Sequence, residues 1–390
     1  MKRFEHLSPT RIVFGAGSLD RAGECARELG SHALVVCGRG AMRSSGTLDR
    51  LTALLRERGL AVSVYDGVSP DPKSVEVDAA LALARRGSCD LLVGLGGGSA
   101  LDAAKAAGVA VGCDSVAEIV GKTLPPTAGS LPVLAIPTTA GSGAEVTKGA
   151  IVTDVARSLK AGIRGPDVFP KIAIVDPELT ATVPAGVAAE TGFDALTHAV
   201  ETYVARGANP LSEALSERAA GLLGESLPGL AAEPPDGERR AALSLAALLG
   251  GLTVANASTC LPHRMQQAMG SAPRLSVSHG RGLAAVYPAW VERAQPFAAA
   301  KFDRLGRLLG EDRFDTALER LRSELGLDAG LEELGFATAD IDACVGGIAG
   351  NLDNDPIDDV EPALIREIYE DSRRRRGVSK PEPARERPFP

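Results

Sequence analysis

Four residues in the second half of the sequence form a set that could bind a divalent metal. Asp194 and His198 are four residues apart in a helical pattern, so their side chains lie on one face of that helix. His263 and His279 come from two later segments. One carboxylate and three imidazoles suit Zn²⁺ or Fe²⁺. On spacing alone, the alternative is a surface pair of Asp194 and His198 with two unrelated histidines.

A glycine-rich loop in the first half of the chain has the composition of a phosphate-binding loop. The segment GLGGGSALDAAK (94–105) follows a strand-like run and opens a helical one, with Ser99 expected as the helix cap and Asp102 at its third position. Backbone N–H groups of glycines can approach an anion closely, and a helix N-terminus favours negative charge. The alternative is a tight turn before a capped helix, because the loop lacks the G-x-G-x-x-G fingerprint and the P-loop lysine. The residues expected near a phosphate are Gly96, Gly97, Gly98 and Ser99.

A second loop rich in small and hydroxyl residues, PTTAGSGAEVT (137–147), follows the strand-like run VLAI. In α/β proteins, ligands bind at the carboxyl ends of the strands. Two such loops favour a long, phosphate-bearing ligand such as a dinucleotide. The hydroxyl residues of this loop are Thr138, Thr139, Ser142 and Thr147.

The elements that must position these residues differ between the two halves of the chain. Up to about Pro184, short β-branched runs alternate with amphipathic stretches rich in Ala, Leu and Arg, which predicts crossover units and a mostly parallel sheet. After it, strand-like runs nearly disappear and long helical patterns take over. The expected strands lie within 33–38, 61–68, 91–98, 133–139, 150–154 and 172–177.

These patterns predict an α/β dinucleotide-binding domain over residues 1–182 and an all-α, metal-binding domain over residues 183–372. The last residues, RRRRGVSKPEPARERPFP (373–390), cannot bury an apolar face and are expected to form a disordered tail.

The composition argues against several classes of protein. A formal charge of −8 over 390 residues does not suit a general nucleic-acid binder. No apolar run reaches the roughly 18 residues of a membrane helix, and the N-terminus lacks the apolar core of a signal peptide. The 6 cysteines lie far apart without a CxxC motif, which favours reduced thiols. We therefore expect a cytoplasmic protein with a small-molecule substrate and neither a nucleic-acid nor a membrane partner.

Four motifs, in this order, resemble the iron-containing (group III) alcohol dehydrogenases: GGGSALDAAK, PTTAGSGAEVT, IVDPELTATVP and TGFDALTHAVETY. The resemblance runs from about Ser8 to about Tyr369. It implies a dinucleotide-binding domain and a helical domain with the active site in the cleft between them. It also implies NADP(H) or NAD(H) as cofactor, Fe²⁺ or Zn²⁺ as metal, and a homodimer or a larger homo-oligomer.

The resemblance implies a role for each position that matches a family motif. Asp194, His198, His263 and His279 match the metal ligands, which are also the catalytic residues. The cofactor-binding set, which includes the hydroxyl of Ser142 from the second loop, consists of Gly96, Gly97, Gly98, Ser99, Asp102, Thr138, Thr139, Ser142, Thr147 and Lys160.

The chain departs from the family where the adenosine ribose would bind. Members that prefer NAD often carry an aspartate after the strand that here ends VVCGRG, with Gly38 and Arg39. Without that carboxylate, Arg39 or Arg43 could bind a 2′-phosphate. We therefore expect a preference for NADP(H), or use of both cofactors. The alternative is that these arginines face solvent.

Two further departures follow the third metal ligand. Many members carry a histidine four residues after it, where this chain has Gln267, and glutamine cannot relay a proton at neutral pH. The interval from His263 to His279 is slightly longer than in common members, but no histidine follows His279. The segment LPHRM resembles the branch that holds hydroxyacid–oxoacid transhydrogenase and the phosphonoacetaldehyde reductases.

Arginines near the metal ligands in the sequence favour an anionic substrate. They are Arg264, Arg274 and Arg281, and with Gln267 the first two are the candidate substrate-binding residues. Guanidinium groups bind carboxylate or phosphonate bidentately. We expect hydride transfer to a small anionic aldehyde, with phosphonoacetaldehyde to 2-hydroxyethylphosphonate as the leading case.

Other functions remain open beside this one. If the arginines lie on the surface, a general short-chain alcohol dehydrogenase is the alternative; a maleylacetate reductase and a hydroxyacid–oxoacid transhydrogenase are others. A lyase similar to dehydroquinate synthase shares the fold, but that branch generally uses a glutamate as its first ligand, and Asp194 argues against it. A non-catalytic binding protein would need no intact ligand set.

Overall fold

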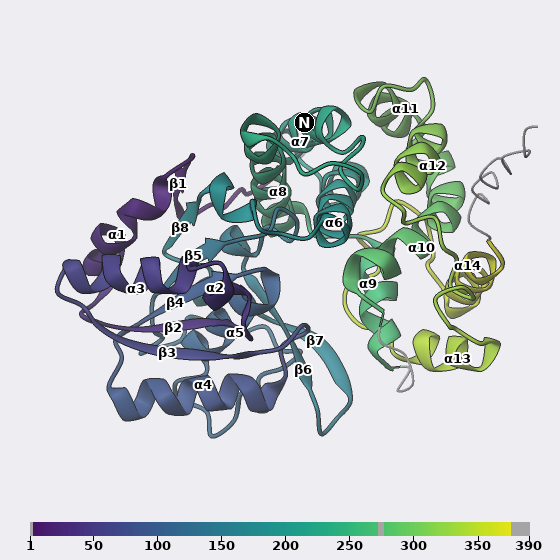
Figure 1. The fold of residues 1–390 in the computed structure, drawn as a ribbon. Coiled ribbons are helices and arrows are strands. Elements are labelled where there is room, and N and C mark those ends of the chain that lie inside the picture. The colour runs from purple at the N-terminus through teal and green to yellow at the C-terminus, as the bar shows by residue number, and fades with distance from the viewer. Residues whose placement is uncertain (1–2, 272–276, 376–390) are drawn as a thin grey trace, which may run out of the picture.

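The structure, a computed structural model, describes residues 3–271 and 277–375 and forms an α/β domain followed by a helical domain (Figure 1). The α/β domain is built on a sheet of 6 parallel strands in the order β1-β8-β5-β4-β2-β3. The predicted fold class is therefore confirmed. The strands are β1 (Arg11–Phe14), β2 (His32–Gly38), β3 (Ala61–Val68), β4 (Leu91–Gly96), β5 (Val133–Pro137) and β8 (Ile172–Val175).

Helices cover both faces of this sheet. Successive side chains of β2 alternate between two cores, with Leu34 and Val36 packed toward α4 and α5 and with Ala33 and Val35 packed toward α1 and α3. A strand buried on both faces carries a continuous apolar run, as the sequence of β2 does. The helices are α1 (Ala22–Leu29), α2 (Ala41–Ser44), α3 (Thr47–Glu57), α4 (Ser74–Gly87) and α5 (Gly98–Val109).

Two features of the strand pattern differ from the expectation. The run at 150–154 is a strand, β6 (Gly149–Asp154), but it pairs antiparallel with β7 (Leu159–Arg164) in a hairpin outside the main sheet. Its side chains alternate between half-buried and buried, as in a two-stranded ribbon covered on one side. Neither β7 nor β1 was expected, because LKAGIR has no continuous apolar run and RIVF is a short edge strand with exposed ends.

In the described residues from 183 onward, every regular element is a helix. A chain of aromatic contacts runs through its core from Phe193 to Tyr287, Trp290, Phe302 and Phe314, with ring centroids 5.2–6.1 Å apart. The α-helices are α6 (Ala185–Val204), α7 (Pro210–Ser226), α8 (Gly237–Ala257), α9 (Leu261–Ala268), α10 (His279–Ala294), α11 (Ala299–Leu308), α12 (Phe314–Glu324), α13 (Thr338–Gly346) and α14 (Pro362–Arg374).

The two domains meet backbone to backbone. Gly143, in the loop after β5, has a left-handed φ of 59°, and a Cβ added there would overlap the Cα of Gly251 in α8. A Cβ on Gly141 would lie 2.7 Å from the carbonyl oxygen of Thr191 in α6. Glycine at these positions lets the loop after β5 lie directly against α6 and α8, which are next to the α/β domain in Figure 1.

Two segments of the helical domain bear on earlier expectations. Arg373 and Arg374 belong to α14 and Arg375 pairs with Glu292, so the tail expected from residue 373 begins no earlier than residue 376; residues 376–390 lie outside the described part. Helix α8 is long and apolar enough by composition to cross a membrane, the one such helix in the described residues. More than half of it is buried, which is typical of a core helix.

Candidate active site

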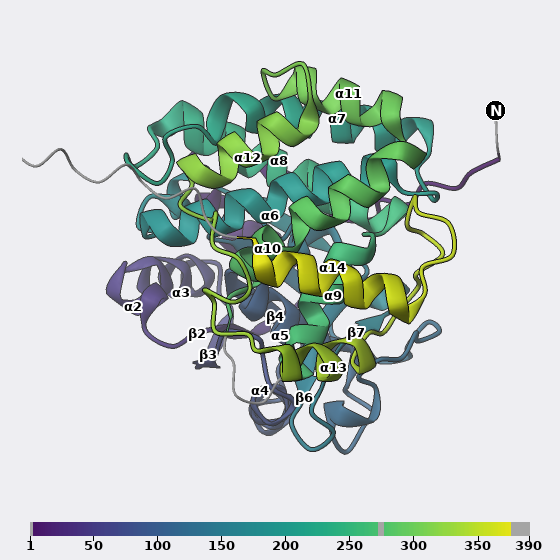
Figure 2. The same cartoon turned by 90° about the vertical axis from the view of Figure 1, so that its right-hand side faces the viewer.

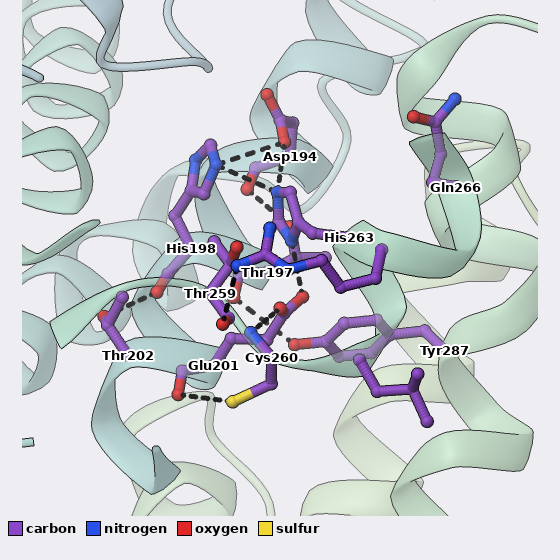
Figure 3. A network of polar contacts seen from close by, with 12 residues as sticks. Asp194, Thr197, His198, Glu201, Thr202, Thr259, Cys260, His263, Gln266 and Tyr287 are labelled. Atoms are coloured by element: carbon purple, nitrogen blue, oxygen red, sulfur yellow. Dashed lines mark hydrogen bonds and ion pairs between the residues drawn. The ribbon is translucent and has the colours of Figure 1, made fainter. Parts of the chain in front are cut away.

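Three helices of the C-terminal domain bring the four predicted metal ligands together. Asp194 and His198 lie one turn apart on α6, His263 is in α9, and His279 is the first residue of α10. The Nε2 atoms of His198, His263 and His279 lie 3.7, 3.5 and 3.3 Å from the Oδ1 atom of Asp194. Figure 3 shows Asp194, His198 and His263 pointing toward one another.

The donor set fits a divalent cation. The Oδ1 atom of Asp194 is buried and has no hydrogen-bond partner among the described residues. The Nε2 atoms of His198 and His263 face each other at 3.0 Å. The Nδ1 atoms of His263 and His279 face acceptors elsewhere, which directs their Nε2 atoms toward the centre of the cluster, where a metal would displace any proton they carry. These residues match the chemistry that Fe²⁺ or Zn²⁺ requires.

The electrostatics of the cluster favour a positive charge at its centre. Burial lowers the pKa of His198 to about 4, so its ring is neutral and able to act as a ligand at neutral pH. Burial opposes a charge on His263 too, but the carboxylates of Glu201 and Asp194 outweigh it and raise the pKa of His263 to about 9. Two buried carboxylates thus stabilise positive charge here.

Two residues that were not predicted orient imidazole rings of the metal-ligand cluster. Glu201 is fully buried, and its Oε1 atom lies 2.7 Å from Nδ1 of His263. Nδ1 of His279 lies 2.5 Å from Oε1 of Gln266. Glu201 follows Asp194 by two helical turns, so the spacing of D-x-x-x-H-x-x-E gave a signal for it. No spacing in the sequence indicated Gln266, because its partner His279 lies in the next helix, beyond a loop.

The two glycine and hydroxyl loops lie side by side at the carboxyl edge of the sheet. β4 and β5 pair in register, with Gly96 opposite Pro137. A Cβ on Gly97 would lie 3.2 Å from Oγ1 of Thr139, and one on Gly98 would lie 2.8 Å from Oγ of Ser142. The backbone of the first loop therefore needs glycine for this approach, and the free N-terminus of α5 lies beside it.

The expected cap of this helix is wrong. The N-cap residue is Gly97, which provides no side-chain hydrogen bond. Oγ of Ser99 accepts from the backbone N–H of Asp71 at 3.2 Å, and Asp102 accepts from the N–H of Ile151 at 2.9 Å. Since no described side chain accepts from the N–H groups of Gly98 and Ser99, these two groups stay available to an anion.

A buried lysine ties the second loop to α5. Lys105 is fully buried, and its Nζ donates to the carbonyl oxygen of Ala144 at 2.8 Å and to Oγ1 of Thr147 at 3.0 Å. Burial lowers the pKa of Lys105, while the nearby carboxylate of Asp102 opposes that shift. Lys160, a predicted cofactor contact, pairs with Asp71 at 2.8 Å.

One pocket of about 660 Å³ joins the metal-ligand cluster to the glycine loop. It is lined by all four predicted metal ligands and by Arg264 and Gln267. The predicted cofactor-binding residues that line it are Gly98, Ser99, Asp102, Thr139, Ser142, Thr147 and Lys160. Gly96, Gly97 and Thr138 lie in the same loops without lining it, and the N–H of Thr138 bonds to the carbonyl oxygen of Gly96 at 2.9 Å.

The remaining predicted residues that the structure describes do not line the pocket. Arg39 pairs with Glu76 at 2.9 Å, and Arg43 pairs with Asp66 at 2.7 Å. Gly38 ends β2 with room for a side chain, since the nearest atom to an added Cβ is 3.5 Å away. The other predicted arginines are Arg281, which pairs with Glu190 at 2.8 Å, and Arg274, which lies outside the described residues.

This arrangement is typical of a dehydrogenase that uses a metal and a nucleotide. The iron-containing alcohol dehydrogenase family matches residues 9–177, and the C-terminal domain of the Fe-containing alcohol dehydrogenase family matches residues 188–369. The chain belongs to the iron-containing alcohol dehydrogenase family and is an oxidoreductase that acts on CH–OH groups.

Similar proteins span nearly the whole chain. The NAD-dependent methanol dehydrogenase of Bacillus methanolicus is 32% identical over 86% of this chain and 90% of its own length. An alcohol dehydrogenase from an archaeal halo-thermophile of a Red Sea brine pool superposes with a TM-score of 0.89 at 28% identity, covering 95% of this chain and 100% of that one. Sulfoacetaldehyde reductase from Bifidobacterium kashiwanohense, in complex with NAD⁺, has a TM-score of 0.84 at 30% identity, covering 96% and 100%.

Proposed function

We propose that this enzyme transfers hydride from NADPH or NADH to a small aldehyde that carries an anionic group, with phosphonoacetaldehyde as the leading substrate. The observation that carries the proposal is the single pocket that the metal-ligand cluster, the glycine loop and Arg264 all line. The same pocket contains Gln267, the second of the substrate-binding residues expected from the sequence.

Different residues of the pocket have different roles in the proposed reaction. Asp194, His198, His263 and His279 would hold Fe²⁺ or Zn²⁺, which when bound polarises a carbonyl oxygen as a Lewis acid, while the nicotinamide supplies the hydride. The N–H groups at the start of α5 bind the pyrophosphate, because this N-terminus has no side-chain cap. Gln267 offers hydrogen bonds without a transferable proton, so water or a ribose hydroxyl supplies the proton to the product.

Similar proteins support two substrate classes. The reductase from Bifidobacterium kashiwanohense is named for sulfoacetaldehyde, an anionic aldehyde, whereas the relative from Bacillus methanolicus is named for methanol. Arg264, buried beside the metal-ligand cluster, favours the anionic class. A general short-chain alcohol dehydrogenase is the second candidate, and maleylacetate reductase and hydroxyacid–oxoacid transhydrogenase activities are further ones.

A substrate screen tests the proposal. The enzyme loaded with Fe²⁺ or Zn²⁺ is assayed for NADPH and NADH oxidation with phosphonoacetaldehyde, sulfoacetaldehyde, acetaldehyde and butanal. We expect kcat/KM to be highest for an anionic aldehyde. Equal turnover of butanal would favour the general alcohol dehydrogenase, and recycling of the nucleotide without net oxidation would favour a lyase.

The same assay tests the cofactor preference. An NADPH preference follows from the missing carboxylate at Gly38 and from Arg39 and Arg43. Arg39 is two-thirds exposed and could rotate to a 2′-phosphate, but Glu76 and Asp66 now compete for the two guanidinium groups. A higher kcat/KM for NADH would show that Arg39 and Arg43 stay paired with these carboxylates and do not bind a 2′-phosphate.

The sequence supports three further proposals about the protein in the cell. We propose that the enzyme acts in the cytoplasm, that it has no nucleic-acid or membrane partner, and that it forms a homodimer or a larger homo-oligomer. Light scattering coupled to size-exclusion chromatography tests the last of these directly.

A further inference from the structure

Arg264 is a buried cation that forms no ion pair with any carboxylate in the part of the chain that the structure describes. It follows the metal-ligand candidate His263 in α9 and is 4% exposed. Its Nη2 donates to Oγ of Ser258 at 3.2 Å and to the carbonyl oxygen of Thr259 at 3.4 Å, both neutral acceptors. Its Nε is buried without a partner among the described residues. A guanidinium removed from water in this way is costly unless an anion joins it.

The carboxylate close to Arg264 is already committed. The Oε1 atom of Glu201 contacts Nδ1 of His263, and its Oε2 atom accepts from the backbone N–H of Cys260, each at 2.7 Å. It acts on Arg264 only through space. Glu201 therefore does not neutralise Arg264. Arg264 also forms no ion pair with any other carboxylate in the described residues.

A second guanidinium lies near the first. Arg164 ends β7, and its side chain makes one long contact, from Nη1 to the carbonyl oxygen of Gly162 at 3.5 Å, with no ion pair in the described residues. Its backbone is fixed on both sides, because its N–H donates to Lys122 and its carbonyl accepts from Leu124. Burial lowers the pKa of Arg164. Burial, and after it the charge of Arg164, lowers the pKa of Arg264.

Both arginines line the pocket that holds the metal-ligand cluster, and β7 packs against α9. In Figure 2, α9 lies next to β7, with α10 and α14 in front. Gly350 lies over the first guanidinium, since a Cβ there would be 3.0 Å from Nε of Arg264. The pocket therefore holds two guanidinium groups, one from each domain, that have no ion pair with any described carboxylate, together with the four ligand candidates.

We propose that Arg164 and Arg264 together bind the oxyanion group of the substrate, and that this pair selects small aldehydes bearing a phosphonate ahead of those bearing a sulfonate or a carboxylate. The proposal rests on the proposed aldehyde reduction and names the substrate class of the same site. Two positive charges match a doubly charged phosphonate, whereas a sulfonate or carboxylate carries one negative charge. Arg164 was not among the candidates from the sequence, where nothing marks it.

The position of Arg264 argues that the anion belongs to the substrate. The phosphate loop at Gly98 and Ser99 lies at the start of α5, whereas Arg264 belongs to α9, the helix that carries His263, and lines the pocket with all four metal-ligand candidates. An anion held by Arg264 therefore lies beside the metal-ligand cluster, where the substrate carbonyl must be. The nucleotide phosphates have their own backbone donors at α5.

Kinetics of Arg164→Gln and Arg264→Gln test the proposal in the metal-loaded enzyme. Each change should raise KM for phosphonoacetaldehyde roughly tenfold to a hundredfold, the loss expected for charge-assisted hydrogen bonds. KM for butanal and for the nucleotide should stay within about twofold, because neither contacts the pair. Arg281→Gln, which removes a nearby charge that Glu190 already neutralises, should leave the ratio of the two aldehydes unchanged.

Binding without turnover separates this proposal from the proposed function. Calorimetric titration with 2-hydroxyethylphosphonate should show weaker binding in both variants, even if no aldehyde is reduced. Arg164 is partly exposed, so Arg164→Gln tests the pair without a change in the core; metal content and thermal unfolding confirm the fold. The pair is not an anion site if both variants bind this phosphonate as the wild type does, or if only KM for the nucleotide rises. Equal KM values for phosphonoacetaldehyde and sulfoacetaldehyde would overturn the charge matching.

Discussion

At the scale of single residues, the three imidazoles of the cluster have different partners behind them. His263 has the carboxylate of Glu201, His279 has the amide of Gln266, and Nδ1 of His198 is buried without a partner among the described residues. A carboxylate behind a ligating ring raises its basicity more than an amide does. We therefore infer that His263 is the strongest donor of the three.

Exchange of Glu201 for glutamine should weaken metal binding. Glu201 accepts from both His263 and the N–H of Cys260, whereas an amide has only one acceptor end and must turn its NH₂ toward one of these donors. Loss of such a partner typically costs about 10- to 100-fold in metal affinity. Competition with a chelator, followed by the ligand-field absorption of Co²⁺, measures the affinity without reference to turnover.

Glu217→Gln serves as the matched control, because Glu217 pairs with Tyr203 and Arg304 instead of with the cluster. Its metal affinity should equal that of the wild type. If Glu201→Gln also retains wild-type affinity, Glu201 does not position His263, and its burial has another cause.

At the scale of elements, the close contact between the two loops makes Gly98 sensitive to any side chain. An added methyl group would lie 2.8 Å from Oγ and 3.0 Å from Cβ of Ser142, at the first turn of α5. We expect Gly98→Ala to weaken dinucleotide binding at least about tenfold through displacement of the second loop. Calorimetric titration of NADH and NADPH measures this loss.

Gly112→Ala is the control for that substitution, because an added Cβ there meets nothing within 4 Å. It should bind both nucleotides as the wild type does. A Gly98→Ala variant with unchanged affinity would mean that the pyrophosphate does not approach this turn.

The elements could be predicted where local pattern and burial agree. The parallel sheet followed from continuous apolar runs, and both loops from clustered glycines at strand ends. The metal-ligand candidates could be found because histidine is rare here and Asp194 and His198 share a helix face. β7 could not be found, because its residues are buried by the hairpin and by α9 instead of by a regular apolar pattern.

The pairing of charged residues could not be predicted, because it depends on partners distant in the sequence. Arg39 is itself a predicted cofactor-binding residue, yet its guanidinium pairs with Glu76 of α4. Nothing in the sequence around Arg164 distinguishes it, yet the fold gives it no ion pair within residues 3–271 and 277–375. Ser99 satisfied a capping pattern, but α5 starts two residues earlier than that pattern predicts, with Gly97 as its N-cap.

At the scale of the whole molecule, acid stability depends on carboxylates that hold backbone turns. Asp90 precedes β4 and accepts from the N–H of His32 at 2.8 Å and from Oγ of Ser31 at 2.7 Å. Burial alone would raise the pKa of Asp90, but these hydrogen bonds outweigh it and keep that pKa below its ordinary value. The stability it adds is therefore present above about pH 4 and is lost as the pH falls through its folded pKa.

Asp90→Asn should lower Tm at pH 7, and the difference from the wild type should shrink as the pH falls below about 4. Calorimetry over a pH series checks this. Asp312→Asn, at an exposed position, should show no such dependence. A constant difference at all pH values would show that the effect does not come from ionisation of Asp90.

The glycine contact between the domains limits how much substitution the active site tolerates. The metal-ligand candidates belong to the helical domain and the glycine loop to the α/β domain, so the contact between Gly143 and Gly251 sets the spacing between them, across which the proposed hydride transfer would occur. A displacement of about 1 Å can cost about 10²-fold in rate. Gly251→Ala should therefore lower kcat by about that factor while metal content holds, whereas Gly237→Ala on the same helix, where an added Cβ meets only Nη2 of Arg240 at 4.0 Å, should not. Natural variation at this boundary should accordingly be narrower than in either apolar core, where side chains can repack around a new methyl group.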